Sequence, residues 1–308
     1  MDTRQERLVA GRYRLLSPLG EGGMGTVWRA HDELLGREVA VKEVTFPPGL
    51  SSEDREVLRE RTRREARAAA QLDHPSAVTV FDVVEQDGSP YLVMELVEAR
   101  TLAQVVRADG PLSPQAVAQV GLALLGALEA AHRQGVLHRD VKPSNVMLAD
   151  DGRVVLTDFG IATSTGDASS LTHTGMLLGS PAYIAPERLR GQPLGPPSDL
   201  WSLGATLFTA VEGRPPYDGG EPLITVAAVA TGEHAPFALA GPLEPVIDGL
   251  LTKDPEQRLD TAAARRLLER VQHADAPART QVLSAPVVDP RPAATSALDL
   301  GEVRDEIA

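Results

Sequence analysis

Two short segments of the sequence concentrate side chains that could carry out chemistry. They run His138-Arg139-Asp140-Val141-Lys142-Pro143-Ser144-Asn145 and Thr157-Asp158-Phe159-Gly160. A carboxylate such as Asp140 can accept a proton from a hydroxyl group. Asn145 and Asp158 offer the hard oxygen ligands that suit Mg²⁺. Phosphoryl transfer needs charge neutralisation and positioning more than covalent help, so these residue types fit that reaction.

Lysine is rare in this chain, which makes its positions informative. Of the 30 basic residues only Lys42, Lys142 and Lys253 are lysine. GC-rich codon usage would explain the excess of arginine. Lysine offers a compact ammonium and arginine a planar fork, so a site can demand one of them. We therefore expect positions 42 and 142 to need a compact ammonium.

A glycine-rich segment lies near the start of the chain, with the sequence GEGGMGTV over residues 20–27. Glycines let the backbone approach phosphate oxygens and direct N–H groups at them. A glycine-rich hairpin turn explains the same pattern. The segment is not a dinucleotide-binding fingerprint, because a strand rather than a helix is expected after it.

Lys42 ends the apolar stretch Val39-Ala40-Val41-Lys42 that follows the glycines. From there its ammonium can reach the α- and β-phosphates of a nucleotide; a lone charge on an edge strand is the alternative. Such a lysine needs a carboxylate to hold it, and we expect Glu65, on an alanine-rich helix downstream, to do so. The alternative for Glu65 is a solvated surface charge.

The pattern of residues changes from strands to helices along the chain. Strands are predicted within 12–46, at 78–85 and at 91–96, and a helix at 51–73. Further helices are predicted at 101–108, 113–134, 200–212, 224–231, 243–251 and 261–273. We therefore expect an N-terminal extension at 1–10, a small lobe at 11–96, a larger helical lobe at 97–273, and a Pro/Ala-rich disordered tail or linker at 274–308.

Residues 10–272 resemble the bacterial, and particularly actinobacterial, eukaryotic-type (Hanks-type) serine/threonine protein kinases. H-R-D-x-K-x-x-N with D-F-G carries the resemblance, together with REARAAAQLDHP, YLVMELVEARTL and GSPAYIAPE. It implies an α+β, bilobal protein-kinase fold, with an antiparallel sheet plus one helix in the N-terminal lobe and a mainly helical C-terminal lobe. It also implies transfer of the ATP γ-phosphate to Ser/Thr hydroxyls of proteins, with Mg²⁺ or alternatively Mn²⁺.

The resemblance also implies roles for individual residues. Asp140 would accept the substrate proton, and Lys142 would neutralise the transferring phosphoryl and mark Ser/Thr specificity. Lys42 and Glu65 complete the catalytic set, and Asn145 and Asp158 would bind the metal. The expected ATP-binding residues are Leu19, Gly20, Gly22, Gly25, Val27, Ala40, Lys42, Met94, Glu95, Val97 and Met147. Ordinary core packing is the alternative for the apolar ones.

Within the segment from Asp158 to Glu187, the stretch from Ala162 to Thr174 is dense in Ser, Thr and Gly. The segment would be an activation loop, although a plain solvated loop is the alternative. Thr172 and Thr174 are the expected phosphoacceptors, ahead of Thr163, Thr165, Ser169 and Ser170. Phosphate can order such a loop by pairing with arginine, and Arg139 is the expected partner. We also expect a structural Glu187–Arg258 ion pair, and a buried helix with Asp199 and Trp201 beneath the catalytic loop.

Composition narrows the remaining classes of function. The net charge of -13 argues against a nucleic-acid binder, and the absence of cysteine excludes disulfides and thiolate metal sites. With neither a signal peptide nor a membrane span, the sequence predicts a cytoplasmic chain, or the cytoplasmic part of a membrane-anchored kinase. Expected partners are protein substrates and, from the resemblance, a second copy bound through the small lobe. The alternatives to a serine/threonine protein kinase are a small-molecule kinase of the same fold and a nucleotide-binding scaffold without catalysis.

Overall fold

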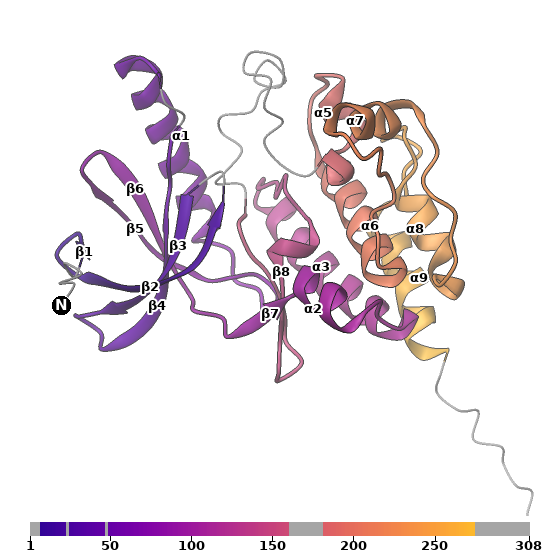
Figure 1. The fold of residues 1–308 in the computed structure, drawn as a ribbon, viewed down its shortest axis with the longest axis horizontal. Coiled ribbons are helices and arrows are strands. Elements are labelled where there is room, and N and C mark those ends of the chain that lie inside the picture. The colour runs from indigo at the N-terminus through magenta and orange to yellow at the C-terminus, as the bar shows by residue number, and fades with distance from the viewer. Residues whose placement is uncertain (1–6, 23–24, 47–48, 160–180, 275–308) are drawn as a thin grey trace, which may run out of the picture. The chain divides into compact units, whose positions relative to one another are not determined.

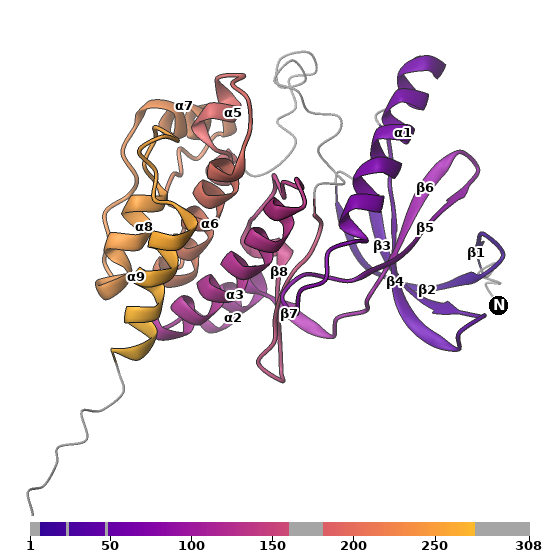
Figure 2. The same cartoon turned by 180° about the vertical axis from the view of Figure 1, so that it is seen from behind.

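An antiparallel sheet and one helix form the first part of the chain in the computed structural model, which describes residues 7–22, 25–46, 49–159 and 181–274. The chain divides into two units at Asp275, and all described residues belong to the first. Figures 1 and 2 show this unit from opposite sides.

The larger sheet has the strand order β1-β2-β3-β4-β6-β5, with every neighbouring pair antiparallel. Its strands are β1 (Leu8–Val9), β2 (Tyr13–Gly22), β3 (Gly25–Asp32), β4 (Arg37–Glu43), β5 (Val80–Gln86) and β6 (Ser89–Met94). The register pairs Val27 with Lys42 and Ala40 with Met94. Residues expected to surround a nucleotide therefore lie on adjacent strands.

Helix α1 (Ser52–Ala69) connects β4 to β5 and packs on β5 and β6. Ser51 caps it by accepting a hydrogen bond from the Asp54 N–H, and two acidic residues follow in the first turn, where they complement the helix dipole. Ala66 and Ala69 face the sheet and are buried. Their small side chains let the helix lie close to the strands, which places Glu65 near the site.

The second part of the chain is mainly helical and contains a small sheet of order β7-β8-β9. Its strands are β7 (Ala99–Thr101), β8 (Val146–Ala149) and β9 (Val154–Leu156). Its helices are α2 (Leu102–Asp109), α3 (Pro114–Arg133), α5 (Pro186–Leu189), α6 (Pro196–Glu212), α7 (Pro222–Thr231), α8 (Glu244–Leu250) and α9 (Thr261–His273). Helix α6 is buried along nearly its whole length and packs against α3 and α8, so it forms the centre of this lobe. Within the described ranges, no helix has both the length and the apolar character needed to cross a bilayer.

The predicted α+β architecture, with a sheet-containing N-terminal lobe and a helical C-terminal lobe, is confirmed. Some details differ from the sequence prediction. Leu8 and Val9 pair with β2, so the expected N-terminal extension contributes a strand to the sheet. Strands β7 to β9 were not predicted, because runs of three or four residues are too short to show a period.

Candidate functional site

The loop between α3 and β8 holds the Asp140 carboxylate with two neighbouring side chains. Lys142 Nζ lies 2.8 Å from Asp140 Oδ2, and Asn145 Nδ2 donates to the same oxygen at 3.0 Å. Asn145 Nδ2 also donates to the Asp140 main-chain carbonyl at 2.8 Å. The short 3-10 helix Pro143–Asn145 brings these residues together. Asp140 is thus fixed in direction, and a positive charge lies beside it.

Asp199, on the buried helix α6, orders the loop that carries Asp140 by binding its main chain. Its carboxylate accepts hydrogen bonds from the main-chain N–H groups of His138 at 2.9 Å and Arg139 at 2.7 Å, and contacts His132 Nε2 at 2.7 Å. Burial would raise the pKa of Asp199, but the hydrogen bond from His132 and the other donors around the carboxylate together outweigh burial and hold the pKa below its usual range. Arg139 has a φ of 66°, a conformation that costs energy for a non-glycine residue and needs such support. The prediction that this buried helix supports the loop is confirmed.

His138 joins the two reactive segments. Its Nε2 lies 2.8 Å from the Thr157 carbonyl, and its Nδ1 accepts the Asp140 N–H at 3.2 Å. This pattern requires the proton on Nε2, and burial, which lowers the pKa of His138, keeps the ring neutral. The Phe159 ring packs edge-on against it with centroids 4.7 Å apart. The loop bearing Asp140 and the segment bearing Asp158 are therefore held in fixed relation.

Lys42 forms an ion pair with Asp158, with Nζ 2.7 Å from Oδ1. The lysine is only 6% exposed. Burial would raise the pKa of Asp158, but the charge and hydrogen bond of Lys42, together with smaller contributions such as the Lys142 charge, lower the pKa from its usual range. Among the ion pairs of the described residues, Lys42 pairs with Asp158 and not with Glu65 as expected.

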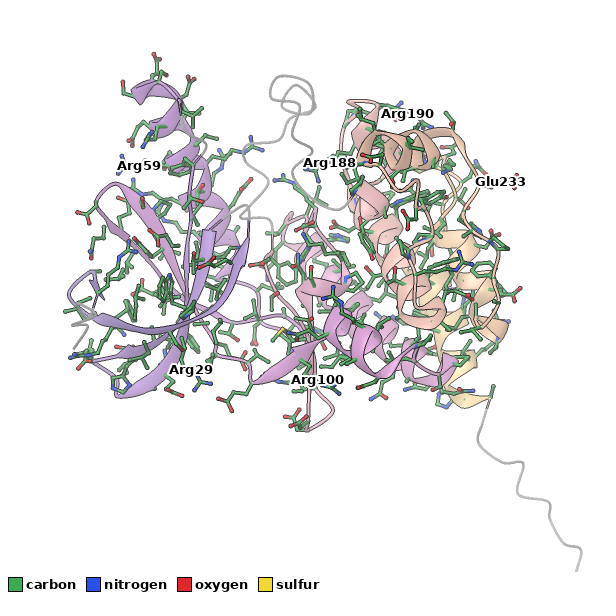
Figure 3. All side chains as sticks on the ribbon, in the orientation of Figure 1. Arg29, Arg59, Arg100, Arg188, Arg190 and Glu233 are labelled. Carbon is green, nitrogen blue, oxygen red and sulfur yellow. The ribbon has the colours of Figure 1, made fainter. Side chains whose placement is uncertain are left out.

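Glu65 instead pairs with Arg139, at 3.0 Å between Oε1 and NH1, and with Arg61 one helical turn earlier at 3.4 Å. Two guanidinium groups are thus grouped around one carboxylate. Arg188 lies close by and donates to the Arg139 carbonyl at 3.0 Å, and burial lowers the pKa of its guanidinium. Figure 3 labels Arg188. The loop thus has several cations beside Asp140.

Asn145 and Asp158 are brought together through Thr157. The Thr157 N–H and hydroxyl both donate to the Asn145 carbonyl, at 2.9 Å and 3.2 Å. Because the Asn145 amide nitrogen is used on Asp140, its amide oxygen remains as a possible metal ligand beside the Asp158 carboxylate. These are hard oxygen ligands of the kind Mg²⁺ binds, so the residues present fit that ion.

Comparison with known proteins identifies this arrangement. A model of the protein kinase domain matches residues 13–272, which include every element that positions Asp140, Lys42 and Asp158. The chain belongs to the protein kinase family. The resemblance stated from the motifs is confirmed, since the curated relatives are bacterial serine/threonine kinases.

Relatives of this kinase domain come from several bacteria. The chain is 38% identical over 260 residues to the serine/threonine-protein kinase PrkC of Bacillus subtilis, covering 82% of this chain and 39% of PrkC. It is 42% identical over 273 residues to the serine/threonine-protein kinase PksC of Streptomyces coelicolor, covering 84% of this chain and 48% of PksC. It is 37% identical over 286 residues to the serine/threonine-protein kinase PknB of Mycobacterium leprae, covering 90% of this chain and 45% of PknB. The chain thus spans less than half the length of these relatives.

Most apolar residues expected at the kinase's adenine pocket share one hydrophobic cluster. Ala40 and Met94 are buried in it, and Val27, Val97 and Met147 pack against it. Leu19 differs: it is 49% exposed and lies at an irregularity in the pairing of β2 with β3. The structure therefore groups five of these side chains and leaves Leu19 at the surface.

The segment expected to contact the adenine edge begins directly after β6, at Glu95. The Glu95 N–H donates to the Thr79 carbonyl at 2.9 Å, and its carboxylate pairs with Arg153. The hinge group that Glu95 can offer a nucleotide is therefore its carbonyl.

The glycine-rich segment forms the ends of β2 and β3, where Gly22 pairs with Gly25. Gly25 has a φ of 127°, and a Cβ there would lie 1.8 Å from the Glu43 carbonyl oxygen. A side chain at position 25 is therefore excluded by the fold. Gly20 and Gly22 have open space within 4 Å of a Cβ position, so packing does not explain them.

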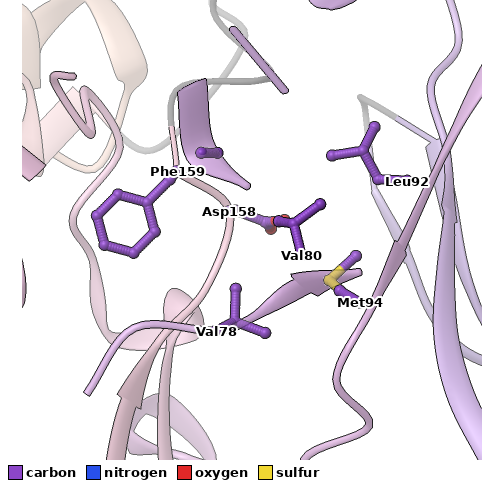
Figure 4. A pocket seen from close by; sticks show the side chains of 7 residues that line it. Val78, Val80, Leu92, Met94, Asp158 and Phe159 are labelled. Carbon is purple, nitrogen blue, oxygen red and sulfur yellow. The ribbon is translucent and has the colours of Figure 1, made fainter. Parts of the chain in front are cut away.

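A small pocket is lined by the seven residues whose side chains Figure 4 draws. Six of them are apolar and one is the carboxylate Asp158; the apolar residues are Ala69, Val78, Val80, Leu92, Met94 and Phe159. Asp158 thus has an apolar surface on one side and Lys42 on the other. The low local polarity strengthens the Lys42–Asp158 attraction.

Several sequence predictions concern residues outside the described ranges, namely Gly160, Thr163, Thr165, Ser169, Ser170, Thr172 and Thr174. The predicted Glu187–Arg258 pair is confirmed, at 2.8 Å and almost fully buried.

His132 and Arg153 both contact residues of the site, and sequence analysis did not single them out. His132 sits among alanines and leucines on α3, and nothing in that pattern indicates that it contacts Asp199. Arg153 follows an ordinary Asp-Asp-Gly turn, and the arginine-rich composition of the chain gave no reason to select it.

Proposed function

We propose that this chain is an ATP-dependent serine/threonine protein kinase. The observation that supports this best is the fixed Asp140 carboxylate, held by Lys142 and Asn145 in a loop joined through His138 to the Lys42–Asp158 pair. A base, a neutralising cation, metal ligands and a phosphate-binding lysine thus occur together. This combination suits transfer of a phosphoryl group to a hydroxyl.

In the proposed reaction Asp140 accepts the proton of the substrate hydroxyl and aims the hydroxyl oxygen at the γ-phosphorus. The new bond forms between that oxygen and the γ-phosphorus, the bond from the γ-phosphorus to the bridging β,γ oxygen breaks, and ADP leaves. Lys142 neutralises charge on the transferring group, and Lys42 orients the α- and β-phosphates. Asn145 and Asp158 would hold Mg²⁺, which would supply further positive charge on the phosphates. Gly20 and Gly22, which have no close neighbours, would leave room for the phosphates above β2 and β3.

Preference for serine and threonine is proposed from Lys142 and from the names of the relatives. A small-molecule kinase of the same fold is the alternative. The Glu187–Arg258 pair speaks against it, because it anchors a segment that in protein kinases adjoins the bound substrate.

The test compares the wild-type protein with Asp140→Asn and Asp109→Asn after incubation with Mg-ATP and a generic protein substrate. Asp109 carries a solvent-exposed carboxylate in an ion pair with Arg100, so it is a matched control. We expect phosphate on serine and threonine, detected by mass spectrometry, in the wild type and control, and its loss in Asp140→Asn. A wild type that binds ATP but incorporates no phosphate would establish the scaffold alternative.

We further propose that the kinase phosphorylates its own activation loop at Thr172 and Thr174. Arg139, the expected phosphate ligand, is paired with Glu65 in this structure. A phosphothreonine carries more charge than a carboxylate and would compete for Arg139. Glu65 would then be released to approach Lys42. Thr172→Ala combined with Thr174→Ala should lower turnover of a generic substrate, and unchanged turnover would remove this part of the proposal.

The domain limits and partners are proposed on the same basis. We propose a kinase region from about residue 11 to 273, protein substrates with serine or threonine acceptors, Mn²⁺ as an alternative metal, and a cytoplasmic location. A homodimer through the N-terminal lobe follows from the family resemblance. Sedimentation of the protein at several concentrations would test it.

A further inference from the structure

The turn between β8 and β9 carries Arg153, whose guanidinium pairs with the Glu95 carboxylate directly after β6. The two residues are 58 positions apart in the sequence, and their side chains are 22% and 37% exposed for Glu95 and Arg153 respectively. A half-buried arginine–carboxylate pair is held more firmly than a fully exposed one, because water screens it less. Arg153 therefore connects the hinge to the β8–β9 hairpin.

The main chain of Glu95 is held from the opposite side. Its N–H donates to the Thr79 carbonyl at 2.9 Å. The segment before Thr79 is itself bound to β9: the Val78 N–H donates to the Leu156 carbonyl at 3.0 Å, and the Leu156 N–H donates to the Ser76 carbonyl at 2.9 Å. Glu95 is thus tied to the same hairpin twice, once through Thr79 and once through Arg153.

The hairpin that carries Arg153 is well fixed. The Ala149 N–H donates to the Arg153 carbonyl at 2.9 Å, and the Arg153 N–H donates to Asp151 Oδ1 at 2.9 Å. The first strand of the hairpin also carries Met147, which pairs with Thr101 on β7 and Val155 on β9. The β8–β9 hairpin therefore carries both Met147, on one face of the proposed adenine pocket, and Arg153, which holds Glu95 at the edge of that pocket.

We propose that Arg153 is a positioning residue that sets nucleotide affinity by holding the Glu95 carbonyl in place for the adenine amino group. The proposal rests on the proposed ATP-binding function. The Glu95 N–H and carboxylate are both used, so the carbonyl is the group left to face a base. Holding it in the bound geometry beforehand lowers the ordering cost when the nucleotide binds.

The test measures adenosine and ADP binding by calorimetry for wild type, Arg153→Met, Arg153→Lys and Arg100→Met. Arg100 is the matched control, since it lies on β7 of the same small sheet and pairs with Asp109 at 2.8 Å at the surface (Figure 3). We expect Arg153→Met to weaken both ligands about threefold to fivefold, the upper range for such a pair. Arg153→Lys should recover part of the loss, and Arg100→Met should bind like the wild type.

Steady-state kinetics and the salt dependence of binding distinguish a positioning role of Arg153 from a general loss of structure in the variant. In Arg153→Met the KM for ATP should rise by the same factor as the dissociation constant for ADP, and kcat should change much less. Affinity for adenosine should fall with added NaCl in the wild type and stay flat in Arg153→Met. If the wild type binds no ADP, the proposed function itself fails. If the wild type binds ADP, and Arg153→Met binds it equally well, the function stands and the role of Arg153 is refuted.

Discussion

Removing the buried guanidinium of Arg258 should destabilise the helical lobe strongly. Its side chain is fully buried and Glu187 is 3% exposed, with the pair held at 2.8 Å and 3.0 Å. The same guanidinium also donates to the main-chain carbonyls of Pro197, Thr252 and Lys253. In Arg258→Met the Glu187 carboxylate would stay buried with Ser198 as its remaining hydrogen-bond partner. Leaving one partner of a buried pair uncompensated costs about 3–5 kcal/mol.

At about 2–4 °C per kcal/mol for a protein of this size, that cost lowers Tm by about 6–20 °C. Calorimetry and urea unfolding at neutral pH measure it, with Arg265→Met as control, because the Arg265–Glu129 pair is partly exposed and worth at most about 1 kcal/mol. Arg258→Met combined with Glu187→Leu should recover part of the loss, since no charge is then left buried. If Arg258→Met lowers the free energy of unfolding no more than Arg265→Met does, the buried Arg258–Glu187 pair does not have the proposed effect on stability.

Two further predictions concern the sheet. In Gly25→Ala the chain must move away from the Glu43 carbonyl and give up a backbone conformation that favours glycine, which should lower the free energy of unfolding by about 1–3 kcal/mol. Gly22→Ala has open space around the new methyl group and should keep the wild-type Tm. Equal Tm values for the two variants would contradict this account. The Arg12 guanidinium lowers the pKa of Asp32 to about 2, so Asp32 stabilises the fold above pH ~4 and loses that contribution as pH falls from about 4 to about 2. Asp32→Asn should therefore have a lower Tm than wild type at neutral pH, with the difference shrinking over that acid range; a difference independent of pH would rule out this account.

The sequence was informative where chemistry restricts residue type. The lysines at 42 and 142 both lie beside a catalytic-site carboxylate, as a need for compact ammonium groups predicts. The Glu187–Arg258 pair was also predictable, because it lies in two recognisable motifs. The predicted limits of α3 differ from the observed ones by one residue at each end, and those of α9 agree, since the apolar period of these helices extends over several turns.

Contacts between distant segments were harder to predict. Glu65 was expected at Lys42, but the choice between Lys42 and Arg139 depends on where α1 lies relative to the catalytic loop, which no local pattern encodes. His132 and Arg153 act through partners 67 and 58 residues away in the sequence. Their residue types are ordinary for a helix and a turn, so only the folded geometry reveals them.

The dependence of the catalytic loop on Asp199 has a consequence for synthesis on the ribosome. Arg139 leaves the ribosome before Asp199, which follows 60 residues later and accepts the Arg139 N–H in the folded protein. At roughly 5–20 residues per second this gap lasts about 3–12 s. During that interval the chain already contains its reactive carboxylate but lacks the helix that holds the positive φ of Arg139. We therefore expect the loop bearing Asp140 to become ordered only after the centre of the helical lobe has been made.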